Sequence, residues 1–152
     1  GISVFVGIEH AYGHGKEVLV YGDLTAEVFS ANPEIAKMDI HEFSDFCHKN
    51  GWFVAHAHPF RDRSYINLDV PPVIDCVDGI EVYNHGNSPE ENFKAVELCE
   101  ANGLIPISGS DSHSVDNCGM AGVAFDKKIT SSKELSNSSY KSDNISNPLA
   151  DS

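Results

Sequence analysis

Imidazole and carboxylate side chains gather at the ends of short apolar runs in this chain of 152 residues. One run ends in "SDSH", which places Asp111 and His113 two positions apart. Another ends in "HAH", which places His56 and His58 at the same spacing. Residues i and i+2 of an extended segment point to the same side. Each pair is therefore expected to face one cavity.

Two further apolar runs end in residues of the same kind. Glu9 and His10 follow the first run, and Asn84 and His85 follow a later one. Histidine, aspartate and glutamate without cysteine make a nitrogen and oxygen ligand set, which suits Zn, Mn or Fe. Because four run ends share this feature, the pattern favours a metal site over a set of separate caps and loop residues.

Each of these residues also has an ordinary structural explanation. Asp111 could cap a helix, and Glu9 could pair with Lys16. A single histidine after a strand is more often a hydrogen-bonded loop residue than a ligand. The histidines expected in a loop or on a helix surface are His14, His41 and His48.

Strand and helix signals alternate along the chain. Helices are predicted at residues 39–50 and 88–103, because each begins with a capping residue followed three positions later by glutamate and ends at glycine. Alternating strands and helices predict an α/β fold with a mostly parallel sheet, whose strand ends would carry the site. The expected strands are residues 2–9, 17–22, 52–58, 78–84, 104–108 and 121–125.

The composition changes near the end of the chain. Residues 1–129 are expected to form one α/β domain. Residues 130–152 are rich in serine and asparagine and poor in large apolar side chains. They are expected to form a tail that is weakly packed or disordered.

Charge and cysteine content exclude several classes of protein. A formal net charge of −13 argues against binding to nucleic acid or anionic membranes, because lysine and arginine hold phosphate backbones. It leaves room for a small phosphorylated substrate, because bound divalent cations reverse the local charge of an acidic pocket. No apolar run is long enough to span a bilayer, and no leader segment is visible. The four cysteines lack a Cys-x-x-Cys pair and are expected to be reduced, as in a cytoplasmic protein.

Three segments in this order resemble the PHP family, which is named for polymerase and histidinol phosphatase. They are "AHPFR" (residues 57–61), "DGIEVYN" (residues 78–84) and "GSDSH" (residues 109–113). The opening "GIEH" and the following "EVLVYG" also resemble the family's glycine-x-glutamate strand and its successor. The resemblance implies a distorted (β/α)₇ barrel of the TIM type that carries up to three metal ions. It also implies hydrolysis of phosphate esters by a metal-activated water.

The resemblance assigns roles to individual residues. Glu9 resembles the carboxylate that bridges metals, and His58 resembles a ligand of the second metal. Asp111 and His113 resemble ligands of the first and third metals. Arg61 is expected to hold the substrate phosphate, because guanidinium matches phosphate oxygens in a bidentate manner.

His56 and His85 lie one step from recognised family positions. His56 is interpreted as a possible further metal ligand. His85 is interpreted as a catalytic proton carrier. The metal centre predicted from the sequence therefore contains Glu9, His56, His58, Asp111 and His113, with Arg61 and His85 as the catalytic residues.

The chain departs from the family at its beginning. The family's His-x-His strand and its Asp-His segment normally precede the glycine-x-glutamate strand, and neither stands before that strand here. The one His-x-His, at residues 56 and 58, belongs to the later "HPF" strand. We therefore expect fewer than three metals and a barrel that is incomplete at its N-terminus. Such a barrel would expose a sheet edge, which a second copy or another chain could cover.

Two functional hypotheses follow. The first is a metal-dependent phosphoesterase that acts on a small phosphorylated substrate. The second is a non-catalytic module that binds metal or phosphate, or a fragment that needs the missing strands or a partner chain.

Overall fold

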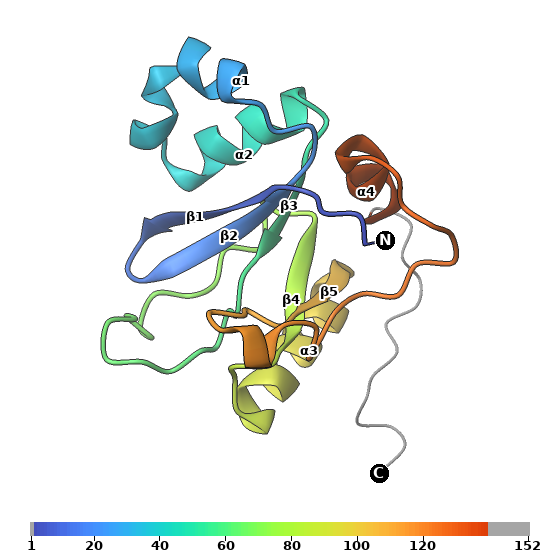
Figure 1. The fold of residues 1–152 in the computed structure, drawn as a ribbon. Helices are drawn as coiled ribbons and strands as arrows, with labels where there is room; N and C mark the ends of the chain where they lie inside the picture. Colours follow the sequence, from blue (N-terminus) through green and yellow to red (C-terminus); the bar gives the residue numbers. More distant parts are fainter. Residues whose placement is uncertain (1, 140–152) are drawn as a thin grey trace.

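The computed structural model describes residues 2–139, and these form a mixed α/β structure around one five-stranded sheet (Figure 1). Two short 3₁₀ segments, Pro33–Lys37 and Val115–Asn117, complete the regular structure. The strands are β1 (Gly7–Gly13), β2 (Lys16–Tyr21), β3 (Phe53–His56), β4 (Gly79–Asn84) and β5 (Ile105–Gly109). The helices are α1 (Ala26–Ala31), α2 (Ile40–Lys49), α3 (Pro89–Asn102) and α4 (Ser132–Ser139).

Strands β1 and β2 form a tight antiparallel hairpin. Gly13 pairs with Lys16, and the two residues between them, His14 and Gly15, have φ values of +57° and +73°. Positive φ at both central residues is typical of the turn whose twist matches a two-residue hairpin. The predicted strand at residues 2–9 is therefore wrong at both ends, because the strand begins at Gly7 and continues to the turn.

The strand order is β1-β2-β3-β4-β5, which matches the order along the chain. β2 pairs with β3 in antiparallel fashion, whereas the β3–β4 and β4–β5 pairs are parallel. The α/β class is confirmed, but the expectation of a mostly parallel sheet is wrong, because the hairpin makes half of the pairings antiparallel. Within residues 2–139 no pairing joins β1 to β5, so the sheet is open rather than closed into a barrel.

The predicted strand at residues 121–125 does not form. The segment has no regular structure, although Val123 packs against a small apolar cluster on the sheet. This short run is flanked by Gly119 and contains Gly122, and glycine weakens a strand. Its apolar character therefore reflects side-chain burial without strand pairing.

Helices α2 and α3 begin and end as predicted. Asp39 and Ser88 each form a capping box with the glutamate three residues later. Gly103 ends α3 in the left-handed conformation, with φ +62°. These local signals determine both boundaries before any tertiary contact is considered.

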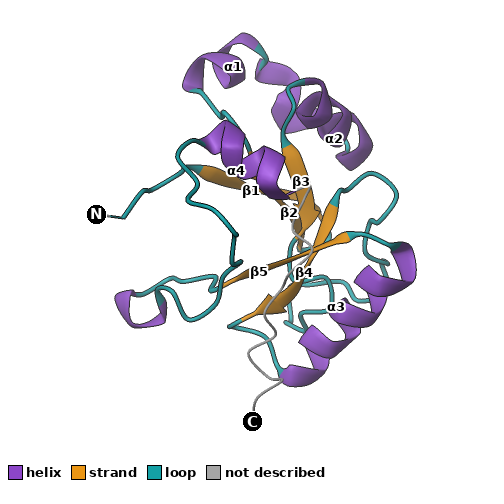
Figure 2. Cartoon of the chain, turned by 90° about the vertical axis from the view of Figure 1, so that its right-hand side faces the viewer, coloured by secondary structure: helices purple, strands orange, loops and turns teal. Residues whose placement is uncertain are grey.

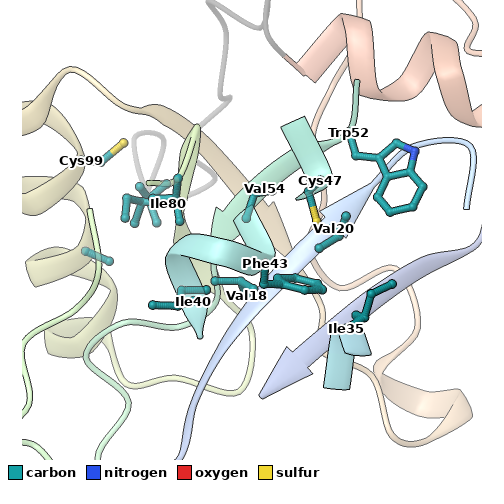
Figure 3. Packing of buried hydrophobic residues seen from close by; sticks show 13 residues of the cluster. Val18, Val20, Ile35, Ile40, Phe43, Cys47, Trp52, Val54, Ile80 and Cys99 are labelled. Carbon is teal, nitrogen blue, oxygen red and sulfur yellow. The ribbon is translucent and has the colours of Figure 1, made fainter. Parts of the chain in front are cut away.

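The sheet is covered differently on its two faces. On the helical side lies the main apolar cluster, to which α2 contributes Phe43 and Cys47 and the strands contribute Val18, Val54 and Ile80 (Figure 3). On the other face Phe53, Ala55 and Ile107 form a smaller cluster with Leu19 and Tyr21 around them. Alternation along each strand therefore sends odd-numbered residues of β2 to the less covered face.

Helix α4 packs against β2 and β3 (Figure 2). Its Ser136 is buried, and the Ser136 hydroxyl donates a hydrogen bond to the Gly51 carbonyl oxygen. Helix α4 thus lies inside the segment that was predicted as a tail, and residues 140–152 lie outside the described residues. The boundary at residue 129 stays a prediction. No helix within residues 2–139 has the length and apolar character needed to cross a membrane.

Candidate metal centre

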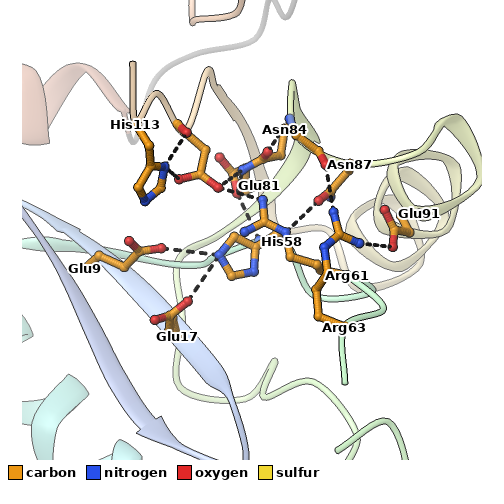
Figure 4. Close-up of polar contacts among 12 residues, drawn as sticks. Glu9, Glu17, His58, Arg61, Arg63, Glu81, Asn84, Asn87, Glu91 and His113 are labelled. Atoms are coloured by element: carbon orange, nitrogen blue, oxygen red, sulfur yellow. Dashed lines mark hydrogen bonds and ion pairs between the residues drawn. The ribbon is translucent and has the colours of Figure 1, made fainter. Parts of the chain in front are cut away.

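One imidazole and two carboxylates meet beside the hairpin (Figure 4). The Nε2 atom of His58 lies 3.2 Å from Oε1 of Glu9 and 3.3 Å from Oε2 of Glu17. One possible ligand atom from each residue lies within 4.8 Å of the other two. We call these residues the Glu9–Glu17–His58 group.

The hairpin register places the two carboxylates together. Glu9 pairs with Leu19, and Glu17 precedes Leu19 by two positions on β2. Glu9, Leu19 and Glu17 therefore share one face of the hairpin. Val18 and Val20 alternate with them and are fully buried on the helical side. Because Val18 and Val20 must be buried on the helical side, the glutamates that alternate with them lie on the opposite side of the hairpin.

His58 reaches the carboxylates because the backbone turns immediately after β3. The Ala57 N–H donates to the Glu17 carbonyl oxygen over 3.0 Å, which keeps the segment next to the hairpin. His58 has φ +28°, a conformation that few side chains adopt. Strained residues of this kind are characteristic of functional sites. The turn aims the ring of His58, whose residue is only 5% exposed, at both glutamates.

A buried glutamate on β4 holds this turn in place. Oε2 of Glu81 accepts hydrogen bonds from the His58 backbone N–H over 2.9 Å and from Nδ2 of Asn84 over 3.1 Å. Burial raises the pKa of Glu81, and the Asn84 hydrogen bond opposes that rise. A β-carbon added at Gly109 would lie 2.9 Å from Oε1 of Glu81, so any larger residue there would displace this carboxylate.

Arg61 and Asp111 form a second part of the site. Nη2 of Arg61 lies 2.6 Å from Oδ2 of Asp111, and Nε of Arg61 donates to Oδ1 of Asn87 over 2.9 Å. Asn84 approaches the same Asp111 oxygen at 3.4 Å. Burial alone would raise the pKa of Asp111, but the hydrogen bond and charge of Arg61 outweigh it and hold the pKa below its ordinary value. Asp111 therefore carries a charge that Arg61 already neutralises.

The Glu9–Glu17–His58 group is electrostatically suited to a cation. Burial raises the pKa of Glu17, and the charge of Glu9 raises it further, while His58 lowers it. Two neighbouring carboxylates repel each other, and a divalent cation between them removes that repulsion. Two oxygen ligands and one imidazole nitrogen fit one ion with further positions open to water. The residues present thus fit a single metal ion.

His56 lies outside this group, and its role as a ligand stays a prediction. Its Nε2 hydrogen-bonds to the Tyr12 hydroxyl and its Nδ1 to the Ala57 carbonyl oxygen, each at 2.8 Å. Burial lowers the pKa of His56 to about 4, so the ring is neutral at pH 7. The spacing rule that paired it with His58 fails, because the positive φ of His58 ends the strand alternation.

The other predicted residues lie at different distances from the group. His113 is 86% exposed, and its Nδ1 hydrogen-bonds to the Asp111 carbonyl oxygen over 2.9 Å. His85 contributes a backbone hydrogen bond to Gly109, and within residues 2–139 its ring makes no hydrogen bond. His10 stacks on Phe43 on the helical side, with ring centroids 3.9 Å apart. The structure thus unites Glu9 with His58 and Asp111 with Arg61, and leaves His113 and His85 at the margin.

Sequence reasoning missed Glu17 and Glu81. Glu17 was interpreted only as the first residue of the expected strand at residues 17–22. The available signal is His14-Gly15, two turn residues between alternating segments. A two-residue hairpin turn fixes the pairing of its strands and so places Glu17 on the same face as Glu9. Glu81 stands within the apolar run "GIEVY", where a buried carboxylate is a signal of its own.

Comparisons with known proteins support a relationship to one family. Residues 89–138, from α3 through β5 to α4, match the model of a PHP-associated family. A solved structure from Bifidobacterium adolescentis, of a protein provisionally named a metal-dependent phosphoesterase, is 25% identical with a TM-score of 0.41. That match covers 50% of this chain and 28% of the other. No curated protein matches the chain. The match over residues 89–138 supports the resemblance to PHP proteins that the motifs predicted, at the level of a PHP-associated segment.

Proposed function

We propose that this chain carries part or all of a metal-dependent phosphoesterase site of the PHP type. The observation that carries the proposal is the Glu9–Glu17–His58 group, in which three different elements bring two carboxylates and one buried imidazole together. A family-level relationship supports the reaction class. The substrate, the metal and the turnover are all part of the proposal.

Each residue of the Glu9–Glu17–His58 group has its own role in the proposed metal site. Glu9 and Glu17 supply carboxylate oxygens, and His58 supplies a ring nitrogen that is aimed at both. Glu81 fixes the His58 backbone and so limits movement of the ring. A bound divalent ion such as Zn, Mn or Fe would activate water and neutralise charge on a phosphate ester.

Arg61 is the proposed phosphate-binding residue. It is 9% exposed, and its two hydrogen bonds to Asp111 and Asn87 fix the plane of its guanidinium. The charge of Arg61 reaches Glu17, where it lowers the pKa. A phosphate bound at the metal would therefore also be attracted by the positive charge of Arg61. Arg61 then orients and neutralises the phosphate, while Asp111 positions Arg61.

The substrate in this proposal is a small phosphorylated molecule. A cleft of about 330 Å³ lined by Lys16 and Lys94 does not support it, because Lys16 alternates with Glu17 along β2 and so lies on the opposite face of the hairpin. The same cleft is also lined by three acidic residues, Asp62, Glu90 and Glu91. The support for an anionic substrate is therefore the guanidinium of Arg61.

The second candidate function is binding without turnover, and one observation favours it. Asp111 is engaged by Arg61 and His113 is exposed, so the described residues around His58 offer one three-ligand group rather than the family's three metal positions. Further strands or another chain would then have to complete a catalytic centre. β1 is the outer strand where they would pair, next to Ile2, Val4 and Val6, which are 95%, 86% and 67% exposed.

Metal analysis combined with a generic phosphatase assay tests the proposal. The full chain is purified without chelator, its metal content is measured, and hydrolysis of bis-p-nitrophenyl phosphate and p-nitrophenyl phosphate is followed with added Mn²⁺ or Zn²⁺. We expect about one ion per chain at this group and a rate that depends on the ion. Glu17→Gln and His58→Ala should each bind one ion fewer than the wild type, whereas exposed Glu27→Gln on α1 should bind as many.

The possible results separate the two candidate functions. Metal-dependent hydrolysis that fails in Glu17→Gln supports the phosphoesterase. Stoichiometric metal without hydrolysis supports the binding module. Absence of metal from the folded chain after incubation with both ions would overturn both.

A further inference from the structure

A second group of mixed ligands lies on the helical side of the sheet, apart from the Glu9–Glu17–His58 group. It contains His41, Asp75 and Cys76, and one possible ligand atom from each lies within 4.8 Å of the others. We propose that these residues, called the His41–Asp75–Cys76 group below, bind Zn²⁺ and fasten the segment before β4 to the start of α2.

The atomic distances are close to those of a metal site. Nε2 of His41 lies 3.2 Å from both carboxylate oxygens of Asp75. A tetrahedral zinc ion with bonds of about 2.0–2.3 Å separates its nitrogen, oxygen and sulfur ligands by about 3.5 Å. Separations within 4.8 Å therefore need only side-chain adjustments. Water can take the fourth position, because the His41 and Asp75 side chains are 58% and 72% exposed.

The backbone around these ligands is already fixed. Asp39 caps α2 by accepting hydrogen bonds from the N–H groups of His41 and Glu42. The Ser44 hydroxyl donates to the Cys76 carbonyl oxygen, which ties the segment before β4 to the same helix. Sγ of Cys76 also lies 4.0 Å from the Ile40 carbonyl oxygen. The ligands thus come from two segments that are held side by side without the ion.

The chemistry of the ligands selects the ion. A thiolate and an imidazole favour Zn²⁺ over Mg²⁺ or Mn²⁺, which prefer oxygen. Cys76 is a free cysteine, and Asp39 and Asp45 add negative charge near its sulfur. The neighbourhood therefore attracts a cation, while the sulfur determines which cation is bound most tightly.

Binding would have a mechanical consequence. The segment between β3 and β4, residues 57–78, contains no helix or strand. It carries Arg61 at one end and Cys76 near the other. Zinc at the His41–Asp75–Cys76 group would cross-link the far end of this segment to α2 and reduce its local opening. The proposed site is therefore structural.

Cobalt(II) is the probe that separates the two groups. The reduced full chain is titrated with Co²⁺, and sulfur-to-cobalt charge-transfer absorption is followed in the near ultraviolet. The Glu9–Glu17–His58 group has no sulfur and cannot give this band. We expect a saturable band with one ion per chain, which Zn²⁺ abolishes by displacing Co²⁺.

Four variants make the test specific. Cys76→Ser should abolish the band, and the exposed thiol of Cys118 provides the matched control, Cys118→Ser, which should keep it. His41→Ala and Asp75→Asn should weaken Co²⁺ binding at least about tenfold, since even loss of a partner outside the ligand shell has that effect. Both side chains are more than half exposed, so these two variants should fold even where Cys76→Ser does not. No band in the wild type, a band that survives in folded Cys76→Ser, or unchanged affinity in His41→Ala would overturn the proposal.

Discussion

The two candidate metal groups have the same size but differ in the burial of their histidine. In each, three possible ligand atoms lie within 4.8 Å of one another. His58 is 5% exposed and rests on the buried carboxylate of Glu81, whereas the side chains of His41 and Asp75 are 58% and 72% exposed. The first group offers oxygen and nitrogen, and the second adds sulfur.

This difference in burial decides whether a substitution changes metal binding alone or the stability of the fold as well. Next to His58 the buried residues Glu81 and Asn84 also hold the backbone in place, so a substitution there changes stability as well as the site. Around His41 the contacts lie at the surface, where ion pairs contribute little. When a variant of the Glu9–Glu17–His58 group loses activity, its stability must therefore be measured as well. When a variant of the His41–Asp75–Cys76 group loses its metal, the loss can be assigned to the missing ligand.

The largest expected effect lies in the buried network. Arg61→Gln would leave the charge of Asp111, whose side chain is only 16% exposed, without its cation. Breaking one side of a buried pair typically costs about 3–5 kcal/mol. Urea unfolding should therefore show a loss of about that size in the free energy of unfolding. The double variant Arg61→Gln with Asp111→Asn should recover part of the loss, because it removes the uncompensated charge. A change below about 1 kcal/mol would mean that solvent already screens this pair.

A smaller effect concerns acid and His56. Its pKa is lowered from 6.5 to about 4 in the folded chain, because burial disfavours the charged ring. Between these two values the unfolded chain binds more protons than the folded chain, so stability falls as the pH falls through this window. The contribution is about 2–3 kcal/mol. Unfolding measured from pH 7 to pH 4 in the presence of chelator should show this loss.

Substitution of His56 checks the source of that pH dependence. His56→Gln keeps polar atoms near Tyr12 but cannot take up a proton, so the decline should become shallower by the same amount. The exposed residue His41 supplies the control, because His41→Gln removes a histidine outside the core. An equally steep decline in His56→Gln would assign the acid sensitivity to other groups.

The sequence predicted helices α2 and α3 well and the hairpin poorly, for physical reasons. Capping boxes at Asp39 and Ser88 are local, so their residues determine the helix starts. The His14–Gly15 turn is equally local, but its consequence is not, since it brings Glu17 to the face of Glu9. Glu17 could be found only once the antiparallel register was known.

The histidine after β3 shows a second limit of pattern reasoning. Strand periodicity placed His56 and His58 on one side, and the positive φ of His58 separates them. Asp111 also has a positive φ, of +47°, and its side chain turns to Arg61. Family motifs identified His58, Asp111 and Arg61 although periodicity could not place them. Strained backbone is a tertiary property, so the partners of these residues required the structure.

The smallest change in the free energy of unfolding is expected at the exposed His41–Asp75–Cys76 group. Without metal, Asp75→Asn removes only a surface pair with His41, so the free energy of unfolding should change by less than about 1 kcal/mol. At a Zn²⁺ concentration about 100 times the dissociation constant, the wild type should gain about 2.7 kcal/mol, because only the folded chain holds the site. Asp75→Asn, which binds more weakly, should gain clearly less. Thermal unfolding with chelator and with Zn²⁺ measures both values. If Zn²⁺ stabilised the wild type and Asp75→Asn equally, the ion would bind elsewhere. The His41–Asp75–Cys76 group would then not be a metal site, and only the Glu9–Glu17–His58 group would remain a candidate.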